Sequence, residues 1–443
     1  MPNSKKKFLI IGEVFVDTHL DDFKDNEGYL VRLGGIFHSA RAFQFLPDCS
    51  FDIAYYASEY LDTHISNISK KIGCTNSFKL GQINGSPNIM LIQESREIGD
   101  QKYSCPLEEH SKIEEFGELH KILEENEYTD ILVFPGKYRL SDLIDTMNDF
   151  KVKVHLDINY LSEVSLLFKI KNLNTVFLSS TKALFDKIKI ESKKDLTKYF
   201  GFFKSLNIII KDNRGGSCLI QLPSEYEFEA PCYPVKNIHS VGVGDVFDTV
   251  FLGLESDCLN KKMKLSSFYA SKYAETFNPK PINLKEAEIA IQFSGNRISW
   301  FERGKINIYM AAPDFPSVDT TLLKKLTSSL EYHNFKARLP IQENGLIENS
   351  LSSSESLPLF EKDYQLLQAC QIMIATLLFN DPGTLVEIGV FFEMKKPVIL
   401  FDPHNLATNM FLRNSNSYIC NSISDTIDAL FELSSNLKKG DLL

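Results

Sequence analysis

The stretch from Leu366 to Phe379 passes from a helical spacing of apolar residues into a short continuous apolar run. This pattern is typical of a helix that leads into a strand buried on both faces of a parallel sheet. Asp381 and the turn Pro382-Gly383-Thr384 follow and open another helix. We therefore predict an α/β domain with a doubly wound parallel sheet, in which the strand ends at Asn380 and Asp381 lies at its carboxyl edge.

Glu387 is predicted to lie in the first turn of the helix that Pro382 opens. The positive end of a helix dipole stabilises an ionised carboxylate there, which suits a nucleophile or an ion-pair partner better than a proton donor. The alternative is that Asp381 is a helix cap and Glu387 a solvated acid.

Three further polar residues are expected at the same sheet edge. Tyr309 lies in an apolar run that reads as a buried strand, and Asp363 is predicted to begin the helix before the strand at 372–379. Asn409 follows the next predicted strand, Val398 to Phe401, after a polar loop. The carboxyl ends of parallel strands meet at one edge, so these side chains are candidates for a single site.

Residues 305 to about 435 resemble the nucleoside 2-deoxyribosyltransferases. The segments that carry the resemblance are IYMAAPDF, KDYQLLQACQIMIA and DPGTLVEIGVFFEMKKPVI. The resemblance implies a flavodoxin-like or Rossmann-like domain at 305–443 that needs no cofactor. It further implies that Asn409 reaches into a neighbouring subunit's pocket, so we expect a homo-oligomer, at least a dimer.

The resemblance also assigns roles in catalysis. Glu387 would attack C1′ of a nucleoside, Tyr309 would orient Glu387, and Asp381 and Asp363 would contact the base or help its protonation. Cleavage of an N-glycosidic bond builds oxocarbenium character, which a carboxylate can trap covalently while a second carboxyl group protonates the base. The sequence leaves open the base, the sugar, and whether another base or water receives the glycosyl group.

A second signal is the segment from His239 to Leu254, HSVGVGDVFDTVFLGL. Gly242 and Gly244 let the backbone approach an anion at a helix N-terminus, and Asp245 would lie beside it as a catalytic base for phosphoryl transfer. The alternative is a tight turn with an acidic helix start, because a lone GxGD is a weak motif.

Residues 1–300 resemble the ribokinase-like sugar and nucleoside kinases of the phosphofructokinase B type. The segments involved are FLIIGEVFVDTHL, LGGIFHSARAF, SPNIMLIQESREIGDQKYSC, which reads as a two-stranded lid, and VHLDINY. The resemblance implies a three-layer α/β domain with a small β lid. It implies substrate contacts at Asp17, Gly34 and Gly35, and ATP and magnesium as cofactors.

Several residues depart from this family's pattern. His38 stands near the position where the family has an Asn, and FLSSTKALF replaces the family's N-x-x-E segment, so that no acid there organises magnesium. Lys211 ends the usual nucleotide-binding strand, and His239 replaces the acid before the GxGD turn. The domain is therefore either a kinase for a sugar or nucleoside, or a degenerate kinase that senses a nucleoside or nucleotide.

Bulk properties agree with a two-domain enzyme that binds small molecules. A chain of 443 residues is too long for one core, and its net charge of −10 argues against a nucleic-acid partner. The apolar run FLIIG near the start of the sequence is interrupted by Glu13 and Asp17 too soon for a membrane or secretory segment. The eight cysteines have no metal-ligand spacing, which predicts reduced thiols in the cytoplasm and no metal site formed by cysteines or histidines.

Two segments of different composition are predicted to connect or cover the domains. We expect a linker at 294–305 that includes Trp300, and a long loop at 342–358. The leading hypothesis is cleavage or transfer of the N-glycosidic bond of a nucleoside or nucleotide, coupled to a kinase domain. The alternative is a nucleotide-depleting effector of stress or phage defence, regulated by a degenerate kinase domain.

Overall fold

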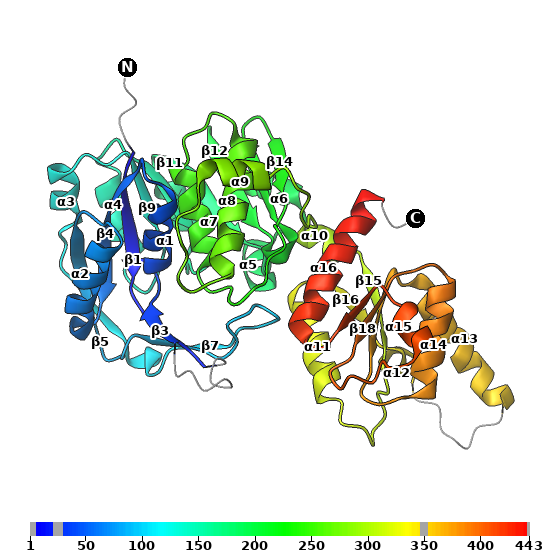
Figure 1. Ribbon diagram of the computed structural model, residues 1–443. Coiled ribbons are helices and arrows are strands. Elements are labelled where there is room, and N and C mark those ends of the chain that lie inside the picture. Colours follow the sequence, from blue (N-terminus) through cyan, green and yellow to red (C-terminus); the bar gives the residue numbers. More distant parts are fainter. Residues whose placement is uncertain (1–5, 21–29, 346–352, 441–443) are drawn as a thin grey trace. The chain divides into compact units, whose positions relative to one another are not determined.

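The computed structural model describes residues 6–20, 30–345 and 353–440 (Figure 1). The chain divides into two compact units. The first comprises Met1–Glu97 and Gln101–Arg297, and the second comprises Ile98–Asp100 and Ile298–Leu443. None of the helices in the described part of the chain combines the length and hydrophobicity that crossing a bilayer requires.

The first unit is built on a ten-stranded sheet with the order β14-β13-β12-β11-β10-β9-β1-β4-β5-β8. Its central strands are parallel, and β8, β13 and β14 are antiparallel additions at the two edges. The strands are β1 (Lys7–Glu13), β4 (Ser50–Ala57), β5 (Ser77–Asn84), β8 (Lys112–Glu115), β9 (Asp130–Val133), β10 (Lys153–Asp157), β11 (Leu173–Ser179), β12 (Leu206–Lys211), β13 (Ser217–Leu222) and β14 (Tyr226–Ala230).

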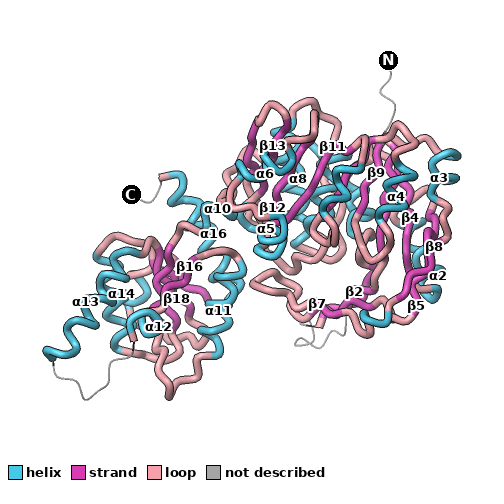
Figure 2. Tube along the Cα trace, turned by 180° about the vertical axis from the view of Figure 1, so that it is seen from behind, coloured by secondary structure: helices cyan, strands magenta, loops and turns pink. Residues whose placement is uncertain are grey.

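Helices cover both faces of this sheet, which gives the predicted three layers (Figures 1 and 2). Phe177 and Leu132 belong to the core that contains the buried residues of α7 and α8. The helices are α1 (Phe37–Ala42), α2 (Asp62–Lys71), α3 (Leu119–Glu125), α4 (Leu140–Met147), α5 (Lys182–Ile188), α6 (Lys193–Phe200), α7 (Val243–Gly253), α8 (Leu259–Ala274) and α9 (Leu284–Ala290). The 3-10 segments are η2 (Phe43–Phe45), η3 (Glu59–Leu61), η4 (Glu108–His110), η5 (Val164–Lys169) and η6 (Asn213–Gly215).

A separate four-stranded sheet forms the lid, with the order β3-β2-β6-β7. The two strands predicted for the lid are β6 (Ile89–Ile92) and β7 (Tyr103–Ser104). They are joined by β2 (Val16–His19) and β3 (Leu30–Leu33), which the sequence did not assign to the lid. Asp17 therefore lies on a lid strand.

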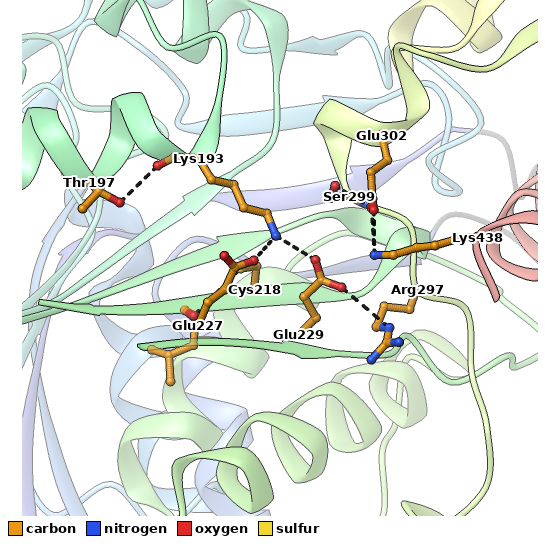
Figure 3. Close-up of polar contacts among 10 residues, drawn as sticks. Lys193, Thr197, Cys218, Glu227, Glu229, Arg297, Ser299, Glu302 and Lys438 are labelled. Atoms are coloured by element: carbon orange, nitrogen blue, oxygen red, sulfur yellow. Dashed lines mark hydrogen bonds and ion pairs between the residues drawn. The ribbon is translucent and has the colours of Figure 1, made fainter. Parts of the chain in front are cut away.

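An ion-pair network connects α6 to the edge strand β14 (Figure 3). Lys193 Nζ pairs with the carboxylates of Glu227 and Glu229, the latter at 2.7 Å. Arg297 Nε lies 3.6 Å from the other carboxylate oxygen of Glu229. Charged side chains along an edge strand hinder its pairing with other chains, so this network protects the open edge of the sheet.

The second unit has a five-stranded sheet with the order β16-β15-β17-β18-β19, and every neighbouring pair is parallel. This is the flavodoxin-like order, as predicted. The strands are β15 (Asn307–Ala311), β16 (Lys336–Arg338), β17 (Ile372–Thr376), β18 (Val398–Phe401) and β19 (Tyr418–Cys420). The helices are α10 (Trp300–Arg303), α11 (Thr321–Tyr332), α12 (Pro340–Asn344), α13 (Ser353–Ala369), α14 (Pro382–Glu393), α15 (Met410–Asn414) and α16 (Ile423–Lys439). Alternate strand residues face two separate apolar clusters, so both faces of the sheet are buried.

Two segments predicted to be irregular contain helices. The expected linker includes α10, which begins with a capping box between Ser299 and Glu302 and is tied to α16 by Lys438 Nζ, 2.8 Å from a Glu302 oxygen (Figure 3). The expected loop at 342–358 contains the end of α12 and the start of α13, while 346–352 lie outside the described residues. Polar composition concealed these helices because capping residues and loop residues are of the same types.

Candidate active site of the second unit and a polar cluster of the first

Tyr309 and Glu387 form the centre of a polar site in the second unit. Tyr309 lies in the middle of β15 and is fully buried. Its hydroxyl donates a hydrogen bond of 2.7 Å to Glu387 Oε1 on α14. Glu387 itself is partly buried, and a carboxylate held by a buried phenol has a fixed orientation, which is the geometry that a nucleophile needs.

The pKa of Glu387 is raised to about 7. Burial is the main cause, the hydrogen bond from Tyr309 opposes it, and the charges of Asp363 and Asp381 add to it. The prediction that Glu387 lies in the first turn of the helix is wrong. The helix begins at Pro382 and has no acidic residue in its first turn, so Glu387 lies one turn further in, where the stabilising effect of the helix N-terminus has faded.

Asp381 is the N-cap of α14. Its Oδ2 accepts hydrogen bonds from the Thr384 backbone N–H at 2.7 Å and from the Thr384 hydroxyl at 2.9 Å. The strand before it ends at Thr376 rather than Asn380. One oxygen of Asp381 therefore caps the helix, as the alternative interpretation predicted. The charge of the same carboxylate also raises the pKa of Glu387.

Asp363 lies in the middle of α13, so the prediction that it begins a helix is wrong. The helix extends back to Ser353 through a Ser-rich segment whose composition indicated a loop. Asp363 Oδ1 accepts a hydrogen bond of 2.7 Å from the Asn344 amide, at the end of α12. Sequence reasoning missed Asn344, because nothing in a single Asn before a Gly indicates a contact with a helix further along the chain.

Asn409 is the N-cap of α15, and its side-chain oxygen accepts a hydrogen bond from the Phe411 backbone N–H at 2.9 Å. The helix that it caps exposes Met410 and Phe411, which are 70% and 79% accessible to solvent. Asn409 is thus exposed and hydrogen-bonded within its own helix, and among the described residues no hydrogen bond joins it to Tyr309 or Glu387.

In the first unit, Asp17 is engaged by another side chain of the protein. His38 Nε2 lies 2.9 Å from Asp17 Oδ2, and His38 Nδ1 lies 3.0 Å from the Tyr273 hydroxyl. All three residues are buried. Burial lowers the pKa of His38 to about 4, so the ring is neutral at pH 7: Nε2 donates to Asp17, and Nδ1 accepts from Tyr273.

The glycines of the first unit allow close approach at two places. A Cβ on Gly34 would overlap the Asp17 carboxyl group, and Gly35, with φ of +58°, would meet the Glu13 carbonyl. Gly242, with φ of +75°, is the N-cap of α7, and a Cβ there would overlap the His38 ring. The structure thus brings Asp17, Gly34, His38 and Gly242 together.

Asp245 lies in the first turn of α7, beside Gly244, as the motif predicts. Its pKa is raised to about 7, chiefly by burial, and the charge of Asp157 adds to the effect while Lys211 opposes it. A carboxyl group with this pKa can exchange a proton near neutral pH.

Lys211 forms ion pairs with two buried acids. Its Nζ lies 2.7 Å from Asp157 Oδ2 and 2.8 Å from Asp248 Oδ2. Burial would lower the pKa of Lys211, but the two carboxylates raise it above its usual range. Sequence reasoning missed Asp248. An acid in the apolar run of α7, three residues after Asp245 and so on nearly the same face, was the available signal.

Oxygen atoms of Asp157, Asp245 and Asp248 lie within 4.8 Å of one another. The resemblance to sugar and nucleoside kinases implies magnesium, but Lys211 already places an ammonium ion against two of these three acids. The residues of the first unit therefore supply their own cation and fit a magnesium ion poorly.

Residues 308–425 match the model of the nucleoside 2-deoxyribosyltransferase family. A comparison with curated proteins gave no match. Among solved structures, a ribokinase from Giardia lamblia is similar at 16% identity and a TM-score of 0.49, over 65% of this chain and 99% of that chain. A Burkholderia thailandensis nucleoside kinase in complex with inosine is similar at 14% identity and a TM-score of 0.47, over 64% and 97%. An Arabidopsis thaliana ribokinase complexed with ribose and ATP is similar at 12% identity and a TM-score of 0.44, over 66% and 100%.

The two units agree with the two resemblances stated from the sequence. The second unit combines the family match with the five-stranded parallel order, and the first combines a three-layer sheet with a four-stranded lid. The chain therefore joins an N-terminal α/β unit, with a three-layer arrangement and a separate four-stranded sheet, to a C-terminal nucleoside 2-deoxyribosyltransferase-like domain.

Proposed function

We propose that the C-terminal domain cleaves or transfers the N-glycosidic bond of a nucleoside or nucleotide, with Glu387 as the nucleophile. The observation that carries this proposal is the 2.7 Å hydrogen bond from buried Tyr309 to Glu387. It provides an oriented carboxylate inside a domain whose family transfers deoxyribosyl groups. The two nearby acids, Asp363 and Asp381, supply the second carboxyl group that such a reaction needs.

In the proposed reaction, a Glu387 oxygen bonds to C1′ as the bond from C1′ to the base nitrogen breaks. The electron pair of that bond leaves with the base, which takes a proton from Asp363 or Asp381. A second base or water then attacks C1′ and gives its proton to the acid that protonated the first base, and Glu387 leaves as the carboxylate. The Asn344 amide, which donates to Asp363 Oδ1, would position that acid toward the base.

The direct experiment is incubation of the protein with a panel of nucleosides and nucleotides, with and without a free acceptor base. Chromatography that separates the free base from a new nucleoside distinguishes hydrolysis from transfer. Release of base from at least one substrate, without added metal or cofactor, is the expected result. Failure of every member of the panel would remove the proposal.

The proposed nucleophile predicts a dependence of rate on pH. Only ionised Glu387 attacks, and its pKa is about 7, so base release should rise as the pH increases through 7. Tyr309→Phe removes the hydrogen bond that lowers this pKa, and it should move the acid limb of kcat/KM to higher pH. Tyr226→Phe, an exposed tyrosine of the first unit, is the control. An acid limb that stays in place in Tyr309→Phe would contradict the role of Tyr309.

We infer that the N-terminal domain is a ligand-binding module that regulates the other domain. The reason is that Lys211 is ion-paired with two of its three clustered acids and His38 is paired with Asp17. A sugar or nucleoside kinase is the second candidate, favoured by Asp245, whose pKa of about 7 suits a catalytic base. Consumption of ATP in the presence of magnesium and ribose, deoxyribose or nucleosides separates the two. Phosphorylation that Asp245→Asn abolishes, with base release unchanged, would establish the kinase.

The exposed apolar side chains of the second unit lead to a prediction about assembly. Val386 and Phe392 are exposed on α14, and Met410 and Phe411 are exposed on α15, the helix that Asn409 caps. We expect these helices to form a symmetric interface that buries on the order of a thousand Å² or more and brings Asn409 to a neighbouring subunit's site. Light scattering over a dilution series should give at least a dimer, and Phe411→Glu should lower both the mass and the activity. A monomer with full specific activity at nanomolar concentration would contradict the shared site.

A further inference from the structure

Three acidic side chains of the first unit converge at the carboxyl edge of its sheet. Asp157 ends β10, and Asp245 and Asp248 lie in the first two turns of α7. One carboxylate oxygen from each acid lies within 4.8 Å of the other two. The oxygens around one Ca²⁺ ion lie about 2.3 to 2.6 Å from it, and therefore at most about 5 Å from one another. The three acids are thus spaced as the ligands of one divalent cation.

The cation that the structure places among these acids is the ammonium group of Lys211. Its Nζ lies 2.7 Å from Asp157 Oδ2 and 2.8 Å from Asp248 Oδ2. Lys211 ends β12, two strands away from β10 in the sheet, and its side chain is only 8% exposed. Two of the three acids are therefore paired with a single positive charge that belongs to the chain itself.

The ammonium group meets the needs of the acids only in part. Asp248 is fully buried, and its Oδ1 has no hydrogen-bond partner among the described residues. A buried carboxylate oxygen without a donor or a counter-ion is unfavourable. An ammonium group has one charge and three N–H donors, whereas a divalent ion has two charges and binds oxygens on all sides. The cluster therefore has capacity for more positive charge than Lys211 supplies.

A structural ion pair elsewhere in the same unit looks different. Asp52 is buried as well, and Lys7 Nζ lies 3.3 Å from its Oδ2. The same oxygen accepts a hydrogen bond of 2.7 Å from the Tyr128 hydroxyl, and Oδ1 accepts one of 2.6 Å from the Asn76 backbone N–H. One acid meets one lysine there, and both of its oxygens have donors. At Lys211, three acids gather near one ammonium group and one buried oxygen is left over, which a simple stabilising pair does not require.

We propose that Asp157, Asp245 and Asp248 form a latent divalent-cation site, in which Lys211 is a tethered substitute for the ion. In the wild-type protein the ammonium group excludes a metal ion by its charge and by its volume. Shortening the Lys211 side chain opens the site to Mn²⁺ or Ca²⁺, which carboxylate oxygens bind. The proposal concerns the first unit alone. It goes beyond the regulatory role proposed above, because it makes that role independent of a divalent metal.

The variants Lys211→Ala and Lys211→Met separate an open site from a filled one. Both remove the ammonium group, but Ala leaves its space free, whereas Met fills most of it with an apolar chain. Electron paramagnetic resonance of Mn²⁺, in a buffer without phosphate or nucleotide, measures the ion that stays free. Lys211→Ala should bind about one Mn²⁺ per chain, and wild type and Lys211→Met should bind it at least about tenfold more weakly. Ca²⁺ should compete for the same site.

Thermal unfolding gives a second readout and locates the ion. Mn²⁺ should raise the unfolding midpoint of Lys211→Ala and leave that of Lys211→Met unchanged, because an ion stabilises only a folded state that binds it. A Lys211→Ala protein that folds only with the ion present would support the proposal in the same way. Adding Asp248→Asn to Lys211→Ala should abolish the rise. Adding Asp145→Asn, at an exposed aspartate of the same unit, is the matched control and should preserve it.

Two results would overturn the proposal. The first is a Lys211→Ala protein that, folded or unfolded, takes up no Mn²⁺ at millimolar concentration. The second is a wild-type protein that binds Mn²⁺ and loses this binding in Asp248→Asn, since Lys211 would then not exclude the ion. Base release by the second unit plays no part in these readouts, so a failure of the cation site and a failure of the glycosidic function are distinguished.

Discussion

Replacing Glu387 by Ala is expected to reduce base release by a factor on the order of a thousand or more. The reason is that the same carboxylate forms the covalent bond and stabilises the developing charge at C1′. Glu393→Ala is the matched control, since Glu393 is an exposed glutamate on the same helix. Its base release should equal that of the wild type, and circular dichroism should show both variants folded.

The same carboxylate also predicts an effect on stability. Glu387 has a raised pKa in the folded protein, so the folded state binds more protons than the unfolded state between the ordinary pKa and about 7. The free energy of unfolding should therefore fall as pH rises through this window, by on the order of 2 kcal/mol, and Glu387→Gln should not show this fall. Base release in Glu387→Ala within tenfold of the wild type would remove Glu387 as the nucleophile.

Replacing Lys211 by Met is expected to destabilise the N-terminal domain by about 3 to 5 kcal/mol, because removal of one partner leaves buried carboxylates without their counter-ion. Lys211 Nζ is 2.7 Å from Asp157 and 2.8 Å from Asp248, and all three side chains are buried. Chemical denaturation with a probe in the first unit measures the change. Lys182→Met, at an exposed lysine, should stay within about 0.5 kcal/mol of the wild type.

The double variant Lys211→Met with Asp248→Asn separates charge from packing. If the lost stability comes from unpaired charge, removing one of the two acids should recover part of it. If the free energy of unfolding of Lys211→Met is within about 1 kcal/mol of the wild-type value, the ion pairs contribute little to stability. The argument that Lys211 replaces a metal would then lose its basis.

The parallel sheet of the second unit could be predicted because its strands are continuous apolar runs. Strands such as Ile372–Thr376 and Val398–Phe401 are buried on both faces, and a helix precedes or follows each. The placement of Tyr309 in a buried strand followed from the same pattern. Which strands are neighbours was set by the family resemblance, and the observed order agrees with it.

Local positions were harder to predict than the strands. Glu387 lies one helical turn further from the helix start than expected. At the helix start the dipole would have stabilised the ionised carboxylate, whereas at its actual position burial raises the pKa of Glu387. Asp363 lies inside a long helix because that helix includes a Ser-rich segment that reads as a loop. In both cases the helix start was misjudged, and helix ends are the least certain part of any sequence pattern.

Contacts between distant residues could not be predicted from local pattern at all. His38 with Asp17, and Lys211 with Asp248, join residues on different elements whose side chains meet only after the sheet has formed. The sequence showed that His38 and Lys211 depart from the kinase pattern, but not what each one touches. These two contacts decide how the N-terminal site is interpreted, because each places a side chain of the protein against a group that a substrate or metal would need.

The central claim is that Glu387 forms a covalent bond with the sugar, and mass spectrometry of the protein with a slow nucleoside substrate tests it most directly. We predict that the mass of one glycosyl group appears on the peptide that contains Glu387 and disappears when an acceptor base is added. Release of base at an undiminished rate without any adduct, or an adduct on another residue, would contradict the account.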